Sequence, residues 1–385
     1  MIPTVSILGV GQTPVANYES LSLRSLGARA CRAAMDDAGV EDVDAIFVGN
    51  MLSAELTGQS HLGPLIGSAV SDSPVECVTV NAACGSGGAV VRMASLAVAS
   101  GAYDVVLAVG VEKMVGRSKE AVTAALASAA DFGREVSNGA TFAALNALLM
   151  QRYMYEYNAM RLDFSVFAEV AHHNATSNPN ARLRKGCSLE NYLTAKMVAE
   201  PVGLYDASPI ADGAAAVVLG RGRCAARSKK RVDIVGSACA TDTLSLQQRS
   251  DPLWLQAVEE STHAALDQAS LRHSDIDLLE LHDAFTIMSA LSLESGGFAS
   301  RGTATKFARD QGIHRTGQLP ISTFGGLKAR GHPVGASGTY QIVEATLQLR
   351  GEAGPNQVPS ASVAMTQSIG GSGATAVTHI LQRAC

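Results

Sequence analysis

An internal duplication is the sequence feature that most constrains the fold of this chain. Segments of the first half recur in the second half in the same order, with matching residue types and spacing. Residues 33–46 correspond to residues 264–279, and the glycine-rich turn 85–88 corresponds to residues 335–338. Because a repeat of this kind determines architecture, we predict two copies of one structural unit.

Each copy alternates short β-branched segments with alanine-rich segments, which is the rhythm of a layered α/β fold. The first copy has predicted strands at 5–10, 45–48, 75–80 and 105–110 and predicted helices at 22–38 and 87–100. The apolar character of the strands predicts a largely parallel sheet that is buried on both faces. We divide the chain into an N-terminal half, residues 1–230, and a C-terminal half, residues 231–385.

A long stretch of the first copy has no counterpart in the second copy. It lies between the strand that ends near Val111 and the predicted strand 214–219, and we expect an inserted loop domain at about residues 115–210. Its predicted helices are 119–130, 142–157 and 164–174. Long insertions on a repeated scaffold usually form substrate-facing lids or contacts between subunits.

Composition excludes several classes of protein. The 385 residues are 47% hydrophobic and 17% charged, unlike a disordered chain. A formal net charge of −5 provides no basic surface for nucleic acid. No segment approaches the roughly 18 to 20 uninterrupted apolar residues of a membrane span, and the N-terminus lacks the pattern of a signal peptide. We expect a cytoplasmic protein with no nucleic-acid or membrane partner.

The seven cysteines are odd in number, widely spread and without a CxxC pair. This pattern indicates neither a disulfide framework nor a metal site, and we expect most of them to be buried thiols.

One of these cysteines lies where a nucleophile is expected. Cys84 stands in the sequence NAACGSGG, between the predicted strand 75–80 and the following helix. Unpaired N–H groups at a helix N-terminus lower a thiol pKa and favour the reactive thiolate. Small neighbours leave room for an acyl group and for backbone donors of an oxyanion hole. Alternatively, the glycines serve only close packing and Cys84 is a small buried residue.

The sequence GHPVGASG places His332 at the equivalent helix start of the second copy. If the copies pack about a pseudo-twofold axis, the two helix starts approach one another and Cys84 meets His332. A histidine there is suited to accept the thiol proton. A lone histidine in a loop is more often structural, but the duplication favours the catalytic interpretation.

Two further segments complete the set. His282 and Asp283 follow the predicted strand 276–281, at the carboxyl edge where α/β sheets bind ligands. His282 is a candidate donor to a substrate carbonyl, and Asp283 has either an active role or that of a cap for the next helix. The glycine-rich turn 368–373 either brings another backbone N–H toward the pocket or is purely structural.

As an ordered set, Cys84, His282-Asp283-Ala284-Phe285, Gly331-His332-Pro333 and Ser368-Ile369-Gly370-Gly371 resemble the thiolase superfamily over nearly the full chain. The resemblance implies a five-layered αβαβα fold from a duplicated βαβαβαββ unit, and a homodimer or dimer of dimers. It also implies acyl-CoA substrates, with coenzyme A as co-substrate and no permanently bound cofactor.

The same resemblance implies residue roles. Cys84 would be the acylated nucleophile and His332 its activator. His282 and His332 would form the first oxyanion hole, and the backbone N–H groups of Cys84 and Gly370 would form the second. His282-Asp283 is closer to the sterol-carrier-protein-x-type and archaeal-type thiolases than to the common ones. Archaeal-type relatives often work with a small accessory protein containing a zinc ribbon and an OB-fold, for which the insertion is a candidate docking surface.

One departure from the family pattern concerns proton transfer. Most thiolases carry a second catalytic cysteine, but the two positions where it occurs hold Ser368 and Ala284 here. A serine hydroxyl is a poor base, so proton transfer would fall to His332, His282 or another group such as Tyr340.

These residues favour an acyltransferase that cleaves a 3-oxoacyl-CoA with coenzyme A, or runs the reverse Claisen condensation, through an acyl-Cys84 intermediate. One alternative keeps the fold but is a retro-aldol lyase that acts on a 3-hydroxyacyl-CoA with an accessory subunit. A second alternative is a non-catalytic thiolase-like subunit that binds acyl-CoA or lipid.

Overall fold

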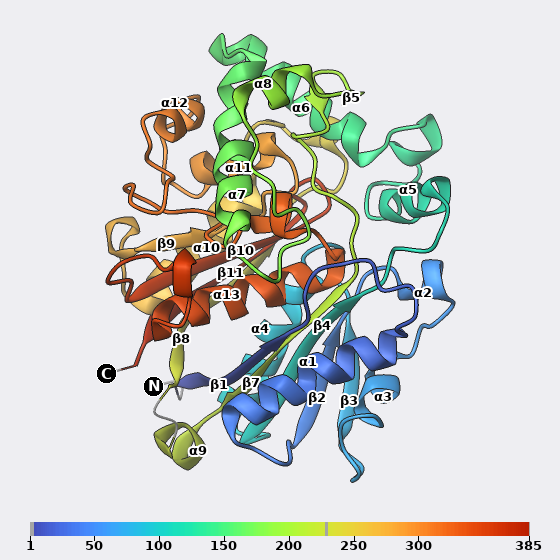
Figure 1. Cartoon of the computed structure of the whole chain (residues 1–385), viewed down its shortest axis with the longest axis vertical. Helices are drawn as coiled ribbons and strands as arrows, with labels where there is room; N and C mark the ends of the chain where they lie inside the picture. Colours follow the sequence, from blue (N-terminus) through green and yellow to red (C-terminus); the bar gives the residue numbers. More distant parts are fainter. Residues whose placement is uncertain (1–3, 228–229, 385) are drawn as a thin grey trace.

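The computed structural model describes residues 4–227 and 230–384, which form an α/β fold around a mixed sheet (Figure 1). Nine strands are hydrogen-bonded in the order β3-β2-β4-β7-β1-β8-β11-β10-β9. Their bounds are β1 Val5–Gln12, β2 Ala45–Gly49, β3 Glu76–Val80, β4 Val105–Glu112, β7 Gly213–Gly220, β8 Val232–Thr241, β9 Leu278–Glu280, β10 Val363–Gly370 and β11 Thr375–Arg383.

The strand pairing repeats between the two halves. In the first half, β2 is parallel to β3 and β4, whereas β7 is antiparallel to β4 and β1. In the second half, β9 is parallel to β10, and β11 is antiparallel to β10 and β8. An isolated parallel bridge between Leu279 and Ile321 takes the place that β3 has in the first half. The two sheets join where β1 pairs antiparallel with β8. The prediction of a largely parallel sheet is therefore wrong, because the last strand of each unit, β7 or β11, runs antiparallel to both of its neighbours.

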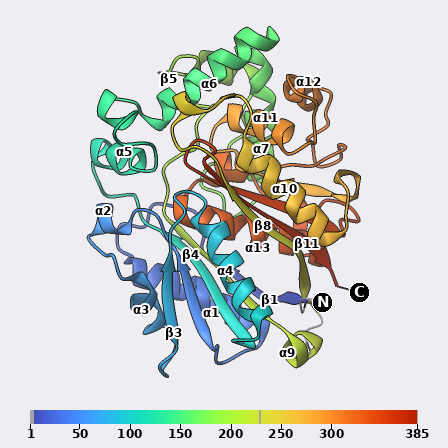
Figure 2. The same ribbon diagram turned by 180° about the vertical axis from the view of Figure 1, so that it is seen from behind.

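Helices and sheets alternate in five layers (Figures 1 and 2). Helices α4 (Ser86–Ser100) and α13 (Ser337–Arg350) pack against each other between the two sheets. The outer faces are covered by α1 (Leu23–Ala38) on one side and α10 (Gln256–Ala269) on the other. This is the predicted αβαβα arrangement.

The glycine-rich turns permit the central helices to approach closely. A Cβ atom on Gly87 would lie 2.7 Å from the backbone nitrogen of Thr339, and one on Gly338 would lie 2.3 Å from that of Gly88. Any side chain at these positions would push the helices apart. The glycines do serve close packing, and in doing so they bring the residues before each helix together.

Helix α4 also corrects the expectation about membrane segments. By length and composition, the stretch Ala83–Ser100 could cross a membrane, with a mean hydropathy of 1.2. However, 61% of the stretch is buried inside the fold, as for a central core helix. Its apolar character is explained by its position between two sheets.

Strand β3 departs from the prediction of strands buried on both faces. It lies at one end of the sheet, and its residues are exposed or half-buried. Helix α3 (Leu62–Gly67) packs against it, but its outer edge has no neighbouring strand within the described chain. Val78 on this strand is 38% exposed.

The insertion lies over the C-terminal sheet, in green at the top of Figure 1. It contains α5 (Lys119–Ala127), α6 (Phe142–Tyr157), α7 (Ser165–Thr176), α8 (Leu189–Thr194), β5 (Met197–Ala199) and β6 (Val202–Gly203). The three predicted helices are present as α5, α6 and α7. Buried residues of the insertion, such as Tyr153 and Phe164, share one core with Leu281 and Ile369 of the C-terminal half. The insertion also packs against α11 (Thr286–Ser295) and α12 (Ala304–Arg309). The remaining helices are α2 (Ser53–Thr57) and α9 (Gly222–Arg227).

The cysteines of the described residues are free thiols. Cys31 and Cys84 are buried, whereas the other four are half-buried or exposed. The prediction that most cysteines are buried is therefore wrong. Cys385 lies outside the described residues.

Candidate active site

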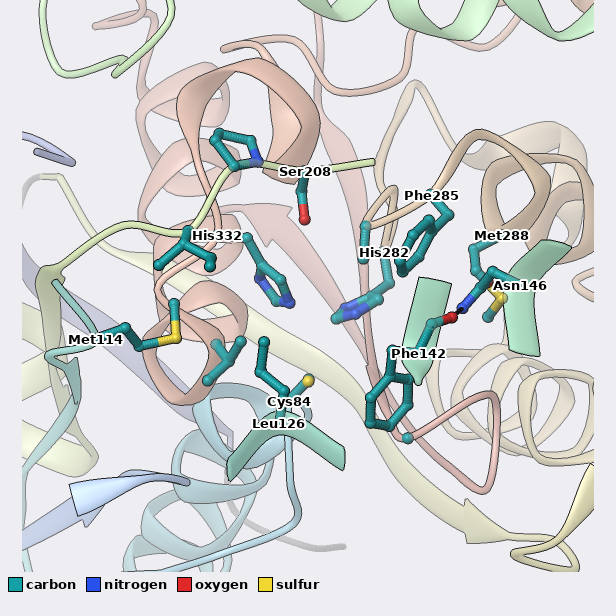
Figure 3. A pocket seen from close by; sticks show the side chains of 15 residues that line it. Cys84, Met114, Leu126, Phe142, Asn146, Ser208, His282, Phe285, Met288 and His332 are labelled. Atoms are coloured by element: carbon teal, nitrogen blue, oxygen red, sulfur yellow. Dashed lines mark hydrogen bonds between the residues drawn. The ribbon is translucent and has the colours of Figure 1, made fainter. Parts of the chain in front are cut away.

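Three side chains that are far apart in the sequence meet in one cavity of about 100 Å³. Cys84 precedes α4, His282 follows β9, and His332 precedes the short helical turn Val334–Ala336. Figure 3 shows the two imidazole rings facing the space above Cys84. The cavity is also lined by Met114, Leu126, Phe142, Asn146, Ser208, Pro209, Ile210, Ala284, Phe285, Met288, Val334 and Gly371.

The turn that carries Cys84 is held in an unusual backbone conformation. Ala83 has a φ of 51°, in the left-handed region that non-glycine residues rarely adopt. The Ser86 hydroxyl stabilises the turn by donating to the Ala83 carbonyl oxygen at 2.6 Å and accepting from the Ala82 N–H at 2.8 Å. This tight turn presents the Cys84 sulfur to the cavity while its backbone enters α4.

The pKa of the Cys84 thiol is raised, whereas a lowered pKa was predicted from its place at a helix N-terminus. Helix α4 begins two residues later, at Ser86, and the sulfur is buried near the Glu112 carboxylate. Burial first, and then the charge of Glu112, raise the pKa of the thiol to about 12, although backbone hydrogen bonds from Cys84 and Gly371 act in the opposite direction. Cys84 is therefore a neutral thiol at rest and needs a base.

Hydrogen bonds fix the tautomer of His332. Its Nδ1 lies 2.7 Å from the Ser337 hydroxyl oxygen, and that hydroxyl donates its single proton to the Pro333 carbonyl oxygen at 3.1 Å. The Ser337 oxygen must therefore accept from Nδ1–H, which leaves a lone pair on Nε2. Burial, with His282 and Arg330 nearby, lowers the pKa of His332 well below its usual value. His332 is a neutral imidazole able to accept a proton.

His282 has the opposite tautomer. Its Nδ1 accepts a hydrogen bond from the Ile369 N–H at 3.2 Å, so its proton resides on Nε2. Burial and the charge of Arg330 lower the pKa of His282 to about 3, and the ring is neutral. The rings of His282 and His332 are 5.2 Å apart between centroids and nearly perpendicular, at 85°. One ring is thus a proton acceptor and the other a hydrogen-bond donor.

Asp283 holds the segment that leads to His332. Its carboxylate accepts from the Ser322 hydroxyl at 2.9 Å and from the Leu327 N–H at 2.6 Å. Gly326, with a φ of 54°, passes so close that a Cβ atom there would lie 2.0 Å from the Asp283 carboxylate. Asp283 does not cap α11, whose first turn receives no side-chain cap. It is neither a cavity-lining group nor the cap of the next helix.

Two auxiliary candidates point away from the cavity. Ser368 is buried beside Gly88 and Gly338, at the contact between the central helices. Tyr340 is fully buried, and its hydroxyl donates to the Thr13 carbonyl oxygen at 2.8 Å. Neither side chain lines the cavity, and their auxiliary role in proton transfer stays a prediction.

The glycine-rich turn brings Gly371 to the cavity rather than the predicted Gly370. Gly371 lines the cavity and its backbone N–H interacts with the Cys84 sulfur, whereas Gly370 does not line the cavity. Gly370 packs instead against the cysteine turn, since a Cβ there would lie 2.4 Å from the Ala82 carbonyl oxygen. The role of Gly370 in an oxyanion hole stays a prediction.

A buried ion pair lies behind His332. Arg330 and Glu344 are both fully buried, with Nε and Oε1 2.9 Å apart. The guanidinium also lies over the Tyr340 ring, 4.7 Å from its centroid. Arg330 was not predicted as a site residue, although an arginine directly before Gly331-His332 was a visible signal in the sequence.

The insertion supplies one wall of the cavity. Leu126, Phe142 and Asn146 come from the insertion, and Phe285 and Met288 face them from α11 and the residue before it (Figure 3). The lining is mostly apolar, and such surfaces bind acyl groups and exclude water.

Comparison with known proteins reveals extensive similarity. The family model described as thiolase, N-terminal domain, matches residues 5–222, and the model described as thiolase C-terminal domain-like matches residues 238–383. The acetyl-CoA acetyltransferase of Methanothermobacter thermautotrophicus is 40% identical, over 98% of this chain and 99% of that protein. The acetyl-CoA acetyltransferase of Methanocaldococcus jannaschii is 37% identical, over 98% of both chains. A solved structure of the Ltp2-ChsH2(DUF35) aldolase has a TM-score of 0.86 and 24% identity, over 100% of this chain and 99% of that chain, which is a likeness of fold.

Proposed function

This chain belongs to the thiolase family and is a CoA-dependent acyltransferase of the thiolase type, and we propose that it works through an acyl group on Cys84. The reaction is cleavage of a 3-oxoacyl-CoA by coenzyme A, or the reverse Claisen condensation. The observation that carries this proposal is the meeting of the Cys84 thiol with the proton-accepting His332 in one cavity.

The first half of the reaction acylates the enzyme. Nε2 of His332 accepts the thiol proton while the Cys84 sulfur attacks the 3-oxo carbon of the substrate. The Cα–Cβ bond then breaks, and its electron pair passes to the α-carbon and thioester oxygen as an enolate. The Nε2–H of His282 donates to the developing oxyanion, and the His332 imidazolium returns its proton to the α-carbon. The products are an acyl-Cys84 thioester and the released CoA thioester, which is acetyl-CoA for an unbranched substrate.

The second half releases the acyl group. His332 accepts the proton of the coenzyme A thiol, whose sulfur attacks the acyl carbon on Cys84. The tetrahedral intermediate collapses with Cys84 as leaving group, and His332 returns a proton to the cysteine sulfur. One histidine thereby carries the proton in both halves, which suits a site whose cavity lacks Ser368 and Tyr340.

The same geometry weighs against the two alternatives. A retro-aldol lyase needs no acylated cysteine, and a binding subunit needs no base beside a thiol. The hydrogen bonds that leave the lone pair of His332 free support acyl transfer over both. Burial of Cys84 further reduces exposure of an acyl intermediate to water.

We further propose a homodimer, or a dimer of dimers, in which β3 contributes to the interface. Its unpaired edge and the exposed Val78 support this, because an open strand edge is a template for pairing with another chain. Met93 and Leu96 of α4 are also exposed, at 37% and 48%, although α4 is a central helix.

A small accessory protein with a zinc ribbon and an OB-fold is a further proposed partner. A solved structure of similar fold, the Ltp2-ChsH2(DUF35) aldolase, is a complex with a DUF35 subunit. Exposed apolar side chains on the insertion support a docking role for it; they include Leu148, Tyr155, Leu189, Leu193, Val198 and Leu204. A cytoplasmic location likewise remains a proposal.

Steady-state thiolysis tests the proposed function. A series of 3-oxoacyl-CoA substrates of increasing chain length is incubated with coenzyme A, and the shortened acyl-CoA is quantified. We expect CoA-dependent turnover by the wild type and its loss in Cys84→Ala. Turnover of a 3-hydroxyacyl-CoA without coenzyme A, retained in Cys84→Ala, would instead establish the lyase.

A further inference from the structure

Glu112, the last residue of β4, is a buried carboxylate beside the cavity that the mechanism above does not use. Its side chain is fully buried. One oxygen accepts from the N–H groups of Met51 at 3.0 Å and Gly335 at 3.1 Å. The other accepts from the side-chain Nδ2 of Asn50 at 2.9 Å, and the Leu52 N–H lies at 3.3 Å from it. Burial of a carboxylate costs free energy, and these donors offset part of that cost while holding the group in one position.

The donors belong to the two segments that flank the reacting groups. Met51 touches the nucleophile, since its Sδ lies 3.8 Å from the Cys84 sulfur. Gly335 lies in the short turn that follows His332. The Glu112 carboxylate therefore bridges the segment against the nucleophile and the segment that carries the base.

The close approach at Gly335 is independent evidence that this junction is tight. A Cβ atom at Gly335 would lie 2.7 Å from a Glu112 carboxylate oxygen and 2.7 Å from the Met51 nitrogen. No larger residue fits without moving one of the bridged segments. The distance between the nucleophile and the base thus depends on the carboxylate that joins them.

We propose that Glu112 is a positioning residue that fixes the spacing of the Cys84 and His332 segments. This inference rests on the proposed role of Cys84 as nucleophile. Electrostatics agree with the geometry, because Glu112 raises the pKa of Cys84 and burial raises the pKa of Glu112 itself to about 7.

Two substitutions separate the charge from the geometry. Glu112→Gln removes the charge and places an amide N–H₂ among N–H donors. Glu112→Asp keeps the charge but shortens the side chain. The matched control is Glu294→Gln, because Glu294 is also buried and accepts from two backbone N–H groups, those of Gly302 and Ala304, away from the cavity.

The experiment measures kcat and KM for thiolysis, and separately the rate at which iodoacetamide alkylates Cys84 at pH 9 without substrate. We expect Glu112→Gln to lower kcat by about 100-fold with little change in KM, because the reacting groups are misplaced. Its alkylation should be about tenfold faster, since loss of the charge lowers the thiol pKa. Glu112→Asp should lower kcat while its alkylation stays slow, and Glu294→Gln should change neither.

Normal kcat and normal alkylation in a folded Glu112→Gln protein would overturn the proposal, as would the same changes in Glu294→Gln. If Glu112→Gln does not fold, Gly335→Ala decides: its added methyl group should lower kcat without accelerating alkylation, and an unchanged kcat would refute the positioning role. The alkylation rate needs no substrate, so a failure of this inference is distinguishable from absence of thiolase activity.

Discussion

His282 and His332 stand 5.2 Å apart between ring centroids and are held in opposite tautomers by different partners. The Ile369 N–H fixes the proton of His282 on Nε2, whereas Ser337 leaves Nε2 of His332 unprotonated. Two residues of the same type therefore have different functions at one site. Donor and acceptor are both required when a thiol must lose a proton while an oxyanion forms.

Replacement of His282 tests the donor assignment. His282→Ala should lower kcat by about 100- to 1,000-fold, the usual effect of losing one oxyanion donor. His282→Asn should recover part of this loss, because its amide N–H can also donate. Steady-state thiolysis with both variants measures the difference. Equal activity of His282→Ala and the wild type would contradict the assignment.

The resting state of Cys84 predicts a particular pH dependence. Because burial raises the pKa of the thiol to about 12, the thiolate fraction should increase about tenfold per pH unit through the neutral and mildly alkaline range. The rate of alkylation by iodoacetamide should therefore rise from pH 6 to pH 10 without a plateau. A plateau near neutral pH would instead indicate a preformed thiolate–imidazolium pair.

The buried ion pair behind His332 predicts a large loss of stability. Arg330→Met leaves the Glu344 carboxylate buried without its partner, which should lower the free energy of unfolding by about 3 to 5 kcal/mol. Denaturant unfolding measures this change. The control is Arg272→Met, because Arg272 pairs with Asp275 while 84% exposed and should contribute less than about 1 kcal/mol. Similar effects of the two substitutions would contradict the predicted cost of leaving the Glu344 carboxylate buried without its partner.

The open edge of β3 predicts how subunits associate. Val78→Lys places a charge on this exposed strand and should shift the proposed dimer toward the monomer. Val198→Lys, on the exposed β5 of the insertion, is the control and should leave the dimer intact. Sedimentation analysis of both variants distinguishes them. A monomeric wild type, or a dimer unaffected by Val78→Lys, would contradict this interface.

The duplication in the sequence was sufficient to predict two similar units and the meeting of Cys84 with His332, whereas the five layers were expected from the resemblance to the thiolase superfamily. Equivalent turns of two similar units approach one another when the central helices pack, so the order of the motifs was enough to predict this meeting. The sequence did not reveal that β3 is exposed, because an apolar strand at the end of a sheet looks the same as one in the middle.

The positions and protonation states of the site residues depend on contacts between residues that are far apart in the sequence. Glu112 meets Met51 and Gly335 only in the folded chain, so neither its position nor its effect on Cys84 was predictable. Ser368 was misplaced because it was assigned to the glycine-rich turn 368–373, whereas β10 continues to Gly370. In the longer strand, the Ser368 side chain faces the central helices rather than the cavity.

The most direct test is intact-protein mass spectrometry after incubation with acetoacetyl-CoA. We expect an added acetyl group that is absent in Cys84→Ala and is discharged by coenzyme A, with or without an accessory protein. A longer 3-oxoacyl-CoA and an aromatic one, run in parallel, identify the preferred acyl group. If no substrate leaves an adduct on Cys84 under either condition, acyl transfer through this cysteine is refuted.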